Sequence, residues 1–392
     1  MTRLLTVSDG LHIPPAALKE TDLPAEWWLT SLNGGYLLLP RVPDLRKLYV
    51  EPTTRCNLRC KTCIRNVWQD PEAHMETALF AKLMDQVGGF SHLKQLVLGG
   101  LGEPLVHPDI LEMIRLARRQ DLAVTLSTNG LRLDAAMARE LVDLGVERIV
   151  LSLDGATAEA FAGVRGAPIE QVVAHARALQ EVKTQRDRLH PVLSVEFVAL
   201  RHTVGELGAL RDLVASLGAD RLLVSHVLVY TDEMRDQVLY GYAPRLPLEG
   251  GGWPVRLGSW VTWGTVQLPR MHWGAERRCR FVQDHALVVG WDGGVAPCYA
   301  LAHSYSYVAI DGRRKKVQRY TFGDIAQQPL VDIWTSRDYC LFRRHVESFD
   351  FPSCPDCDLR ASCDLRAENE ACWGWSPSCA DCLWAQDIIR CP

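Results

Sequence analysis

The sequence predicts an α/β protein with a cysteine-rich C-terminal region, and two observations carry this prediction. From residue 48 onward, short β-rich runs alternate with segments of helical periodicity. In addition, ten of the thirteen cysteines lie at residue 279 or later. The β-rich runs are apolar enough to be buried on both faces, which is typical of a parallel sheet. Six such βα units form either a doubly wound sheet or most of a (β/α) barrel.

The predicted elements fall into four regions. Residues 1–45 lack the βα rhythm and are expected to form an N-terminal cover. Residues 46–235 carry the six predicted strands, at 48–53, 95–100, 122–128, 148–155, 192–200 and 221–230, with helices such as 108–120 and 134–145 between them. Residues 236–278 form a bridge rich in Pro, Gly and Trp, without a convincing regular element. Residues 279–392 are expected to contain short strands, loops and one helix among the cysteines.

The charge balance argues against several classes of partner. The chain has 43 basic and 47 acidic residues, a formal net charge of −4, and no long run of either sign, which predicts no binding of nucleic acid or of an anionic membrane. No stretch approaches the roughly 18 uncharged apolar residues of a membrane span. The N-terminal apolar run is too short for a signal peptide, so we expect a cytoplasmic protein. In that reducing compartment the cysteines are expected to be metal ligands or redox groups.

Three cysteines directly follow the first predicted strand. Cys56, Cys60 and Cys63 have the spacing C-x3-C-x2-C, within "EPTTRCNLRCKTC". Three thiols are too few for the four ligands of a structural zinc site, and they are an odd number for disulfides. The set suits a metal centre with one open position, and a labile zinc site is the alternative.

This motif resembles that of the radical S-adenosylmethionine (SAM) superfamily. The resemblance implies that the three thiolates hold three irons of a [4Fe-4S] cluster, while the fourth iron binds the amino and carboxylate groups of SAM. One electron from the cluster then cleaves SAM to a 5′-deoxyadenosyl radical. In this family the residue before the third cysteine is usually aromatic and packs near the adenine. Here that residue is Thr62, and Trp68 follows Cys63 by five positions.

Polar residues at the ends of the predicted strands match further SAM motifs of this family. "GGLGEP" resembles its Gly-Gly-Glu-Pro motif with one inserted residue, and Glu103 or nearby carbonyls are expected to receive the SAM ammonium. "LSTNG" and "LSLDG" end the third and fourth strands, where side chains reach the ribose and methionine. Arg165 in "FAGVRG" is expected to pair with the SAM carboxylate. The residues assigned to SAM by resemblance are Gly100, Gly102, Glu103, Ser127, Asn129, Ser152, Asp154 and Arg165.

The C-terminal cysteines resemble those of the SPASM domain, which binds two auxiliary [4Fe-4S] clusters. The matching pieces are C-x13-G-x4-C from Cys279 to Cys298 and C-x2-C-x5-C from Cys354 to Cys363. The candidate ligands are Cys279, Cys298, Cys354, Cys357, Cys363, Cys372, Cys379, Cys382 and Cys391. Nine candidates for about eight ligand positions leave the pairing open. Cys340 lies on a predicted amphipathic helix and is expected to pack there. A zinc ribbon is the alternative reading of this region.

The resemblance covers residues 46–392 and implies a partial (β/α)6 TIM-like barrel followed by a Cys-rich SPASM iron–sulfur domain. "CKTCIRNVW" and "PSCADCLWAQDIIRCP" resemble the subgroup of maturases for tungsten-cofactor oxidoreductases. The expected partners are a flavodoxin- or ferredoxin-type electron donor and a tungsten-dependent aldehyde oxidoreductase. Alternatives are a maturase of a ribosomally made peptide, a small-molecule dehydrogenase, and a non-enzymatic electron carrier or scaffold. SAM turnover to 5′-deoxyadenosine excludes the last.

No catalytic acid or base is assigned from the sequence. Aromatic or polar-tipped residues near the sixth strand and the bridge are candidates for substrate contact, although such residues more often belong to a core or a lid. They are His226, Tyr230, Trp260, Trp263 and Trp273.

Overall fold

The computed structural model describes residues 26–32, 35–240, 265–269, 277–309 and 312–391. Its centre is a ten-stranded sheet with the order β14-β11-β10-β3-β4-β5-β6-β7-β8-β9. The six predicted strands are neighbours in chain order and pair in parallel. They are β3 (Lys47–Val50), β4 (Gln95–Leu98), β5 (Ala123–Thr128), β6 (Arg148–Ser152), β7 (Val192–Ala199) and β8 (Arg221–His226). The predicted α/β fold with a parallel sheet is therefore confirmed.

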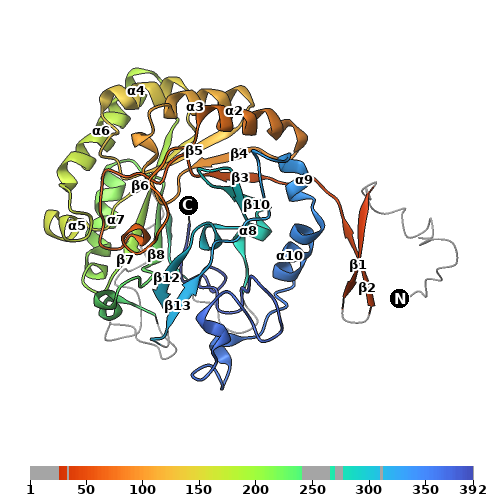
Figure 1. The fold of residues 1–392 in the computed structure, drawn as a ribbon. Helices are drawn as coiled ribbons and strands as arrows, with labels where there is room; N and C mark the ends of the chain where they lie inside the picture. The colour runs from red at the N-terminus through yellow and green to blue at the C-terminus, as the bar shows by residue number, and fades with distance from the viewer. Residues whose placement is uncertain (1–25, 33–34, 241–264, 270–276, 310–311, 392) are drawn as a thin grey trace.

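The strand order decides between the two architectures that the strand pattern alone left open, and it confirms the partial barrel that the family resemblance implied. A doubly wound sheet reverses its strand order at a switch point, whereas β3 to β8 run on without reversal. The helices that follow β3 to β7 along the chain cover the outer side of the resulting arc (Figure 1). They are α2 (Thr77–Gln86), α3 (Ile110–Arg119), α4 (Ala135–Asp143), α5 (Ala158–Arg165), α6 (Ile169–Gln185) and α7 (Leu207–Ser216). This arrangement is a partial (β/α) barrel.

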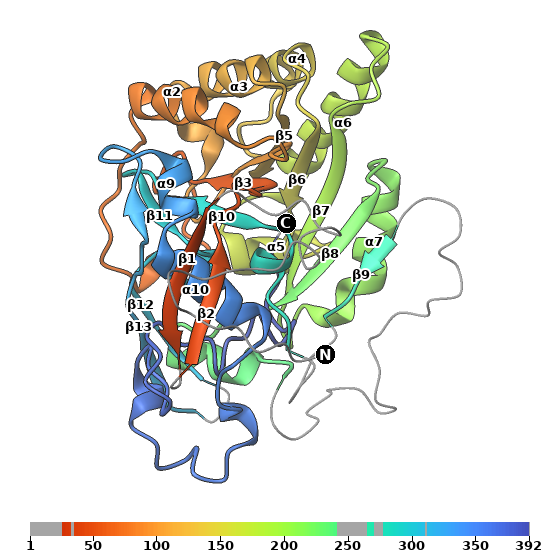
Figure 2. The ribbon, with the colours of Figure 1, turned by 90° about the vertical axis from the view of Figure 1, so that its right-hand side faces the viewer.

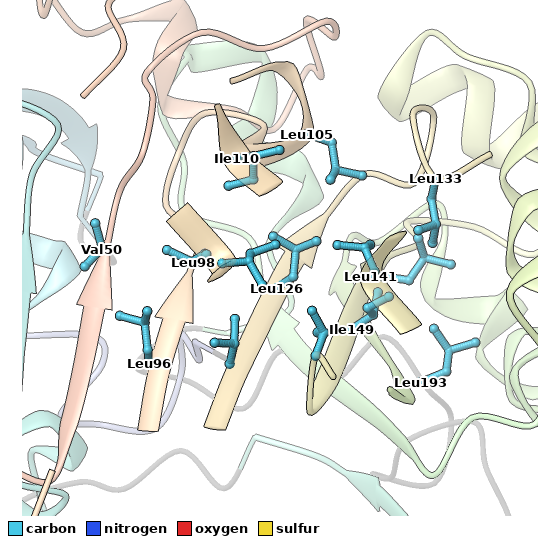
Figure 3. Close-up of a cluster of buried hydrophobic side chains, with 14 of the residues drawn as sticks. Val50, Leu96, Leu98, Leu105, Ile110, Leu126, Leu133, Leu141, Ile149 and Leu193 are labelled. Atoms are coloured by element: carbon cyan, nitrogen blue, oxygen red, sulfur yellow. The ribbon is translucent and has the colours of Figure 1, made fainter. Parts of the chain in front are cut away.

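The side chains along each strand point alternately into a packed outer layer and into the barrel interior. Leu96, Leu98, Leu126 and Ile149 belong to the fully buried core between the strands and the helices (Figure 3). Since successive side chains of a strand point to opposite faces, the residues between them face inward. At the amino ends of the strands the inward residues line a cavity of about 350 Å³, which includes Thr125, Val150, Ser194 and Arg221. The interior is thus partly open.

Local capping explains why the predicted helix at 134–145 forms where it does. The Asp134 carboxylate accepts hydrogen bonds from the backbone N–H groups of Ala136 and Met137, both at 2.9 Å, which satisfies free donors of the first turn of α4. Gly145, with a φ of +68°, follows the end of the helix.

The C-terminal region is joined to the barrel by its own strands. β10 (Ala286–Val289) pairs in parallel with β3, and β11 (Gly294–Ala296) and β14 (Gly323–Asp324) extend the sheet from β10. On the other edge, β9 (Thr265–Gln267) pairs in parallel with β8. No regular element was expected in the bridge at 236–278, and β9 corrects that prediction: a three-residue strand is too short for a clear periodic pattern.

Shorter elements complete the C-terminal region: α8 (Arg280–Gln283), a hairpin of β12 (Tyr305–Val308) and β13 (Arg314–Val317), α9 (Leu330–Trp334) and α10 (Arg337–Glu347). The hairpin and the C-terminal loops lie at the opposite end of the molecule from α2, α3 and α4 (Figure 2). Cys340 is buried on α10, in keeping with its predicted packing role.

In the N-terminal region, β1 (Trp27–Leu32) and β2 (Gly35–Pro40) form a hairpin. It contacts the segment between α9 and α10, where the Trp28 indole N–H donates to the carbonyl of Thr335 at 2.8 Å. No helix among the described residues is both long and apolar enough to span a bilayer.

Candidate functional site

The three cysteines of the first motif lie on a loop that leaves the carboxyl end of β3. The base of this loop is closed by hydrogen bonds between its two ends: the Thr54 hydroxyl donates to the carbonyl of Pro71 at 2.7 Å, and Met75 N donates to the carbonyl of Pro52 at 2.8 Å. Cys56, Cys60 and Cys63 are all half-buried on the loop. The segment that the sequence predicted as a ligand loop is therefore a closed, anchored structure at the edge where barrel enzymes build their sites.

Burial and a nearby arginine shift the pKa of these three thiols in opposite directions. Burial raises the pKa of all three thiols, that of Cys60 to about 11, while the Arg165 guanidinium lowers it.

Among the described residues, no three Cys, His, Asp or Glu side chains converge closely enough to ligate a single metal ion. An iron–sulfur cluster, in contrast, takes its thiolates on separate irons.

The glycine-rich loop after β4 packs directly against the start of the cysteine loop. A Cβ atom on Gly102 would lie 1.9 Å from the carbonyl oxygen of Thr53, and one on Gly100, whose φ is +125°, would lie 2.7 Å from a carboxylate oxygen of Glu51. The backbone N–H of Leu101 donates to that carboxylate at 2.9 Å. The family resemblance assigns Gly100 and Gly102 to the SAM site. In the structure, close approach to residues 51–55 already requires them.

Glu103 is buried and its carboxylate accepts three hydrogen bonds from the protein. The donors are the Thr128 hydroxyl and the Asn129 backbone N–H, each at 2.7 Å, and the Leu105 N–H at 3.0 Å. Burial raises the pKa of Glu103, and these hydrogen bonds lower it. Glu103 thus fixes the end of β5 against the glycine loop. Its contact with the SAM ammonium stays a prediction.

Two of the other strand-end residues face the same region. The Asn129 side-chain amide donates to the Asn57 side chain at 2.8 Å and lies 3.8 Å from the sulfur of Cys56, so the end of β5 meets the cysteine loop. Ser127 lies beside Gly99, where an added Cβ would be 3.1 Å from the serine Cβ.

Asp154 and Arg165 form a buried ion pair at the carboxyl end of β6. The distance from Arg165 Nε to Asp154 Oδ2 is 2.8 Å, and the side chains are 12% and 1% exposed, respectively. Asp154 also accepts from Val198 N at 3.0 Å. Burial lowers the pKa of Arg165, but the negative charges of Asp154 and Cys60 outweigh it and raise that pKa. Among the described residues, the two Nη groups of Arg165 have no hydrogen-bond partner, so they can still bind a carboxylate.

Glu196 is a residue that the sequence analysis missed. It lies on β7 opposite Ser152 of β6, and Asp154 and Arg165 are its electrostatic neighbours. Burial and the Asp154 carboxylate raise the pKa of Glu196 to about 7, and Arg165 partly offsets them. Its carboxyl makes no hydrogen bond within the described part of the chain. A single charged residue inside the apolar run "VLSVEFVAL" was the available signal.

The C-terminal cysteines separate into two groups. One group lines a cavity of about 200 Å³, beside Lys47, Tyr49 and the indole of Trp384; its cysteines are Cys279, Cys298, Cys379, Cys382 and Cys391. Burial and the neighbouring thiols of this group raise the pKa of Cys298 and Cys379. The sulfur of Cys391, which lines the same cavity, accepts the Trp384 indole N–H at 3.2 Å. The second group contains buried Cys354 and its electrostatic neighbour Cys372, with Cys357 and Cys363 close to them along the chain.

The residues suggested for substrate contact are less informative. His226 is buried, its ring lies 5.4 Å from that of Tyr240, and burial lowers its pKa to about 4. Tyr230 is also buried and packs against Tyr305 at 6.1 Å between ring centres. Both belong to packed regions, and Trp260, Trp263 and Trp273 lie outside the described residues.

Comparison with known proteins identifies the family of this chain. Residues 50–196 match the profile described as the radical SAM superfamily, and residues 279–358 match SPASM, an iron–sulfur cluster-binding domain. A tungsten-containing aldehyde ferredoxin oxidoreductase cofactor-modifying protein of Pyrococcus furiosus is 37% identical over 358 residues, which cover 89% of this chain and 97% of that protein. The chain belongs to the radical SAM superfamily.

A second relative and a solved structure of similar fold each match most of the length of this radical SAM enzyme. The pre-heme d1 synthase of Dinoroseobacter shibae is 31% identical over 376 residues, which cover 86% of this chain and 88% of that protein. The crystal structure of Streptococcus suis SuiB bound to S-adenosylmethionine has a TM-score of 0.55 at 14% identity, covering 84% of this chain and 73% of that one. The membership establishes an enzyme that uses SAM and an iron–sulfur cluster.

Proposed function

We propose that this radical SAM enzyme acts in the maturation of a tungsten-dependent aldehyde oxidoreductase, by abstracting hydrogen from a cofactor, protein or peptide substrate. The observation that carries the proposal is the 37% identity to the Pyrococcus furiosus cofactor-modifying protein, which extends over 97% of that protein. The cysteine loop, the glycine loop and the strand-end polar residues all lie within this aligned length. These elements support a complete SAM site, as an enzyme requires, and argue against a non-enzymatic scaffold protein.

Different residues of this chain would have different roles in the SAM site. Cys56, Cys60 and Cys63 would hold the [4Fe-4S] cluster, and the open Nη groups of Arg165 would bind the SAM carboxylate. Glu103 would hold the glycine loop in place while this loop lies along SAM. The bound cofactors supply the radical chemistry, which is one-electron cleavage of SAM followed by hydrogen abstraction. A flavodoxin or ferredoxin would supply the electron.

The two C-terminal cysteine groups would hold two auxiliary clusters. Four cysteines of the cavity group, Cys279, Cys298, Cys379 and Cys382, would ligate one of them. Cys354, Cys357, Cys363 and Cys372 would ligate the other, and Cys391 is then the ninth thiol. Thiolate clusters can relay electrons between the substrate and an outside partner, which suits an oxidative modification.

The cysteine loop provides the first test. Replacing Cys56, Cys60 and Cys63 by Ala should remove about four irons per chain and abolish formation of 5′-deoxyadenosine, while the C-terminal clusters stay bound. Cys340→Ala is the matched control, because Cys340 is buried on α10 and is not one of the candidate ligands, so its replacement should leave both readouts unchanged. If the triple variant still cleaves SAM reductively, the assignment of this loop is wrong.

The substrate is tested separately, with the reduced wild-type enzyme. Incubation with an aldehyde oxidoreductase that lacks its mature tungsten cofactor should raise 5′-deoxyadenosine formation above the background rate and restore oxidoreductase activity. A precursor peptide that stimulates turnover when the oxidoreductase does not would instead favour a peptide maturase.

A further inference from the structure

His303 is a buried histidine held between two carboxylates. It follows Cys298 by five residues, in the connection between the 3-10 turn η8 (Tyr299–Leu301) and β12. Its Nε2 atom lies 2.9 Å from an oxygen of Glu51, and its Nδ1 atom lies 2.5 Å from an oxygen of Asp70. The side chains of His303 and Glu51 are only 4% and 1% exposed. Such complete removal from water requires that opposite charges compensate one another.

The two carboxylates stand at opposite ends of the cysteine loop. Glu51 directly follows β3 and precedes the three cysteines, and Asp70 follows the last of them. Glu51 also accepts the backbone N–H of Leu101 from the glycine loop through its other oxygen. A single imidazole of the C-terminal region therefore joins both ends of the cysteine loop and, through Glu51, the glycine loop.

The charged surroundings favour the imidazolium form. Burial lowers the pKa of His303, but the Glu51 and Asp70 carboxylates outweigh it and raise this pKa to about 9. Among the described residues, Arg319, which is itself paired with Asp292, and the phenol of Tyr299 also lie near these carboxylates. The ring of Trp68 packs 4.7 Å from the imidazole ring. At neutral pH His303 thus carries a positive charge between the two carboxylates.

We propose that protonated His303 is a positioning residue that couples the auxiliary iron–sulfur region to the SAM site. It holds the two ends of the cysteine loop and the glycine loop in the geometry that binds SAM. Loss of its proton leaves two carboxylates facing a neutral ring, which removes the attraction that closes the loop and adds repulsion between the carboxylates. The inference rests on the SAM site described above and adds a dependence of that site on the C-terminal region.

The test uses the full-length, cluster-loaded protein and SAM itself as the ligand. His303→Gln keeps a hydrogen-bonding side chain but removes the charge. We expect its iron content to stay near wild type while its SAM affinity falls about tenfold, within the usual range of coupling between sites. His345→Gln is the matched control, because His345 is equally buried on α10 beside Asp350, at 3.5 Å, and should leave SAM affinity unchanged.

The pH profile separates positioning by charge from simple packing. The protonated form is present below the pKa of about 9, so wild-type SAM affinity should fall as the pH rises through about 9. His303→Gln should lack this transition. Asp70→Asn removes one of the two carboxylates that raise the pKa, so it should move the transition to lower pH.

Two outcomes overturn the proposal. One is wild-type SAM affinity and an unchanged pH profile in His303→Gln. The other applies if that variant fails to fold: an Asp70→Asn protein with its transition still at about pH 9 shows that His303 does not control the site. Neither outcome affects the proposed function, which depends on SAM cleavage by the wild-type enzyme.

Discussion

Arg165→Ala should damage both SAM binding and the fold, because the guanidinium has two partners. One is the predicted SAM carboxylate, bound by the free Nη groups. The other is Asp154, paired with Nε at 2.8 Å and only 1% exposed. Removal of the arginine therefore leaves a buried carboxylate to which, within the part of the chain that the structure describes, only the Val198 N–H donates.

The magnitude follows from this geometry. At 2.8 Å two unit charges attract each other by about 6 kcal/mol when the effective dielectric constant is about 20. Part of this attraction is offset by the cost of burying both groups, and breaking one partner of a buried pair typically costs about 3–5 kcal/mol of folding free energy. SAM affinity should fall about ten- to a hundredfold, the effect of losing one charge-assisted hydrogen bond.

Urea denaturation measures the first effect, and calorimetric titration with SAM measures the second. The matched control is Arg186→Ala, because Arg186 pairs with Asp143 at 2.9 Å but both side chains are about half exposed, at 47% and 53%. Loss of such a surface pair should lower the free energy of unfolding by only about 0–1 kcal/mol. Adding Asp154→Asn to Arg165→Ala should restore about 0.5–3 kcal/mol of folding free energy, because the second substitution removes the unpaired buried charge. If Arg165→Ala is no less stable than the Arg186 control, the buried pair does not act as described.

Three further outcomes are expected. Gly102→Ala should lower the free energy of unfolding by about 1–3 kcal/mol and weaken SAM binding, because the added Cβ would lie 1.9 Å from the Thr53 carbonyl oxygen. The control Gly88→Ala, which has open space around it, should change neither stability nor SAM binding. Infrared spectra should show a protonated carboxyl band that disappears as the pH rises through about 7 and is missing in Glu196→Gln; a band that persists above that range contradicts the assignment. Cys382→Ala should reduce the iron content from about twelve to about eight per chain without loss of SAM cleavage to 5′-deoxyadenosine, whereas stoichiometric zinc in the wild type would support a zinc ribbon.

The strands and the first metal motif were predictable from sequence because both are local patterns. Apolar runs of four to eight residues separated by helical periodicity specify βα units wherever they pack, and the six predicted strands are those observed. The spacing of Cys56, Cys60 and Cys63 likewise needs no distant residue to be recognised. Short strands such as β9 carry too little pattern, and the charge of Glu196 gave no indication of its neighbours.

The sequence alone determined that the chain builds a parallel α/β core, places three thiols after its first strand and ends in a cysteine-rich region. The family resemblance implied a partial barrel, and the structure confirmed it. Only the tertiary structure decided that β10 returns to pair with β3 and that the cysteines divide into groups. The same holds for His303, whose partner Glu51 directly follows β3 at the start of the barrel. These features depend on contacts between residues far apart in the chain, and such contacts leave no periodic signal because they arise only when separate elements pack together.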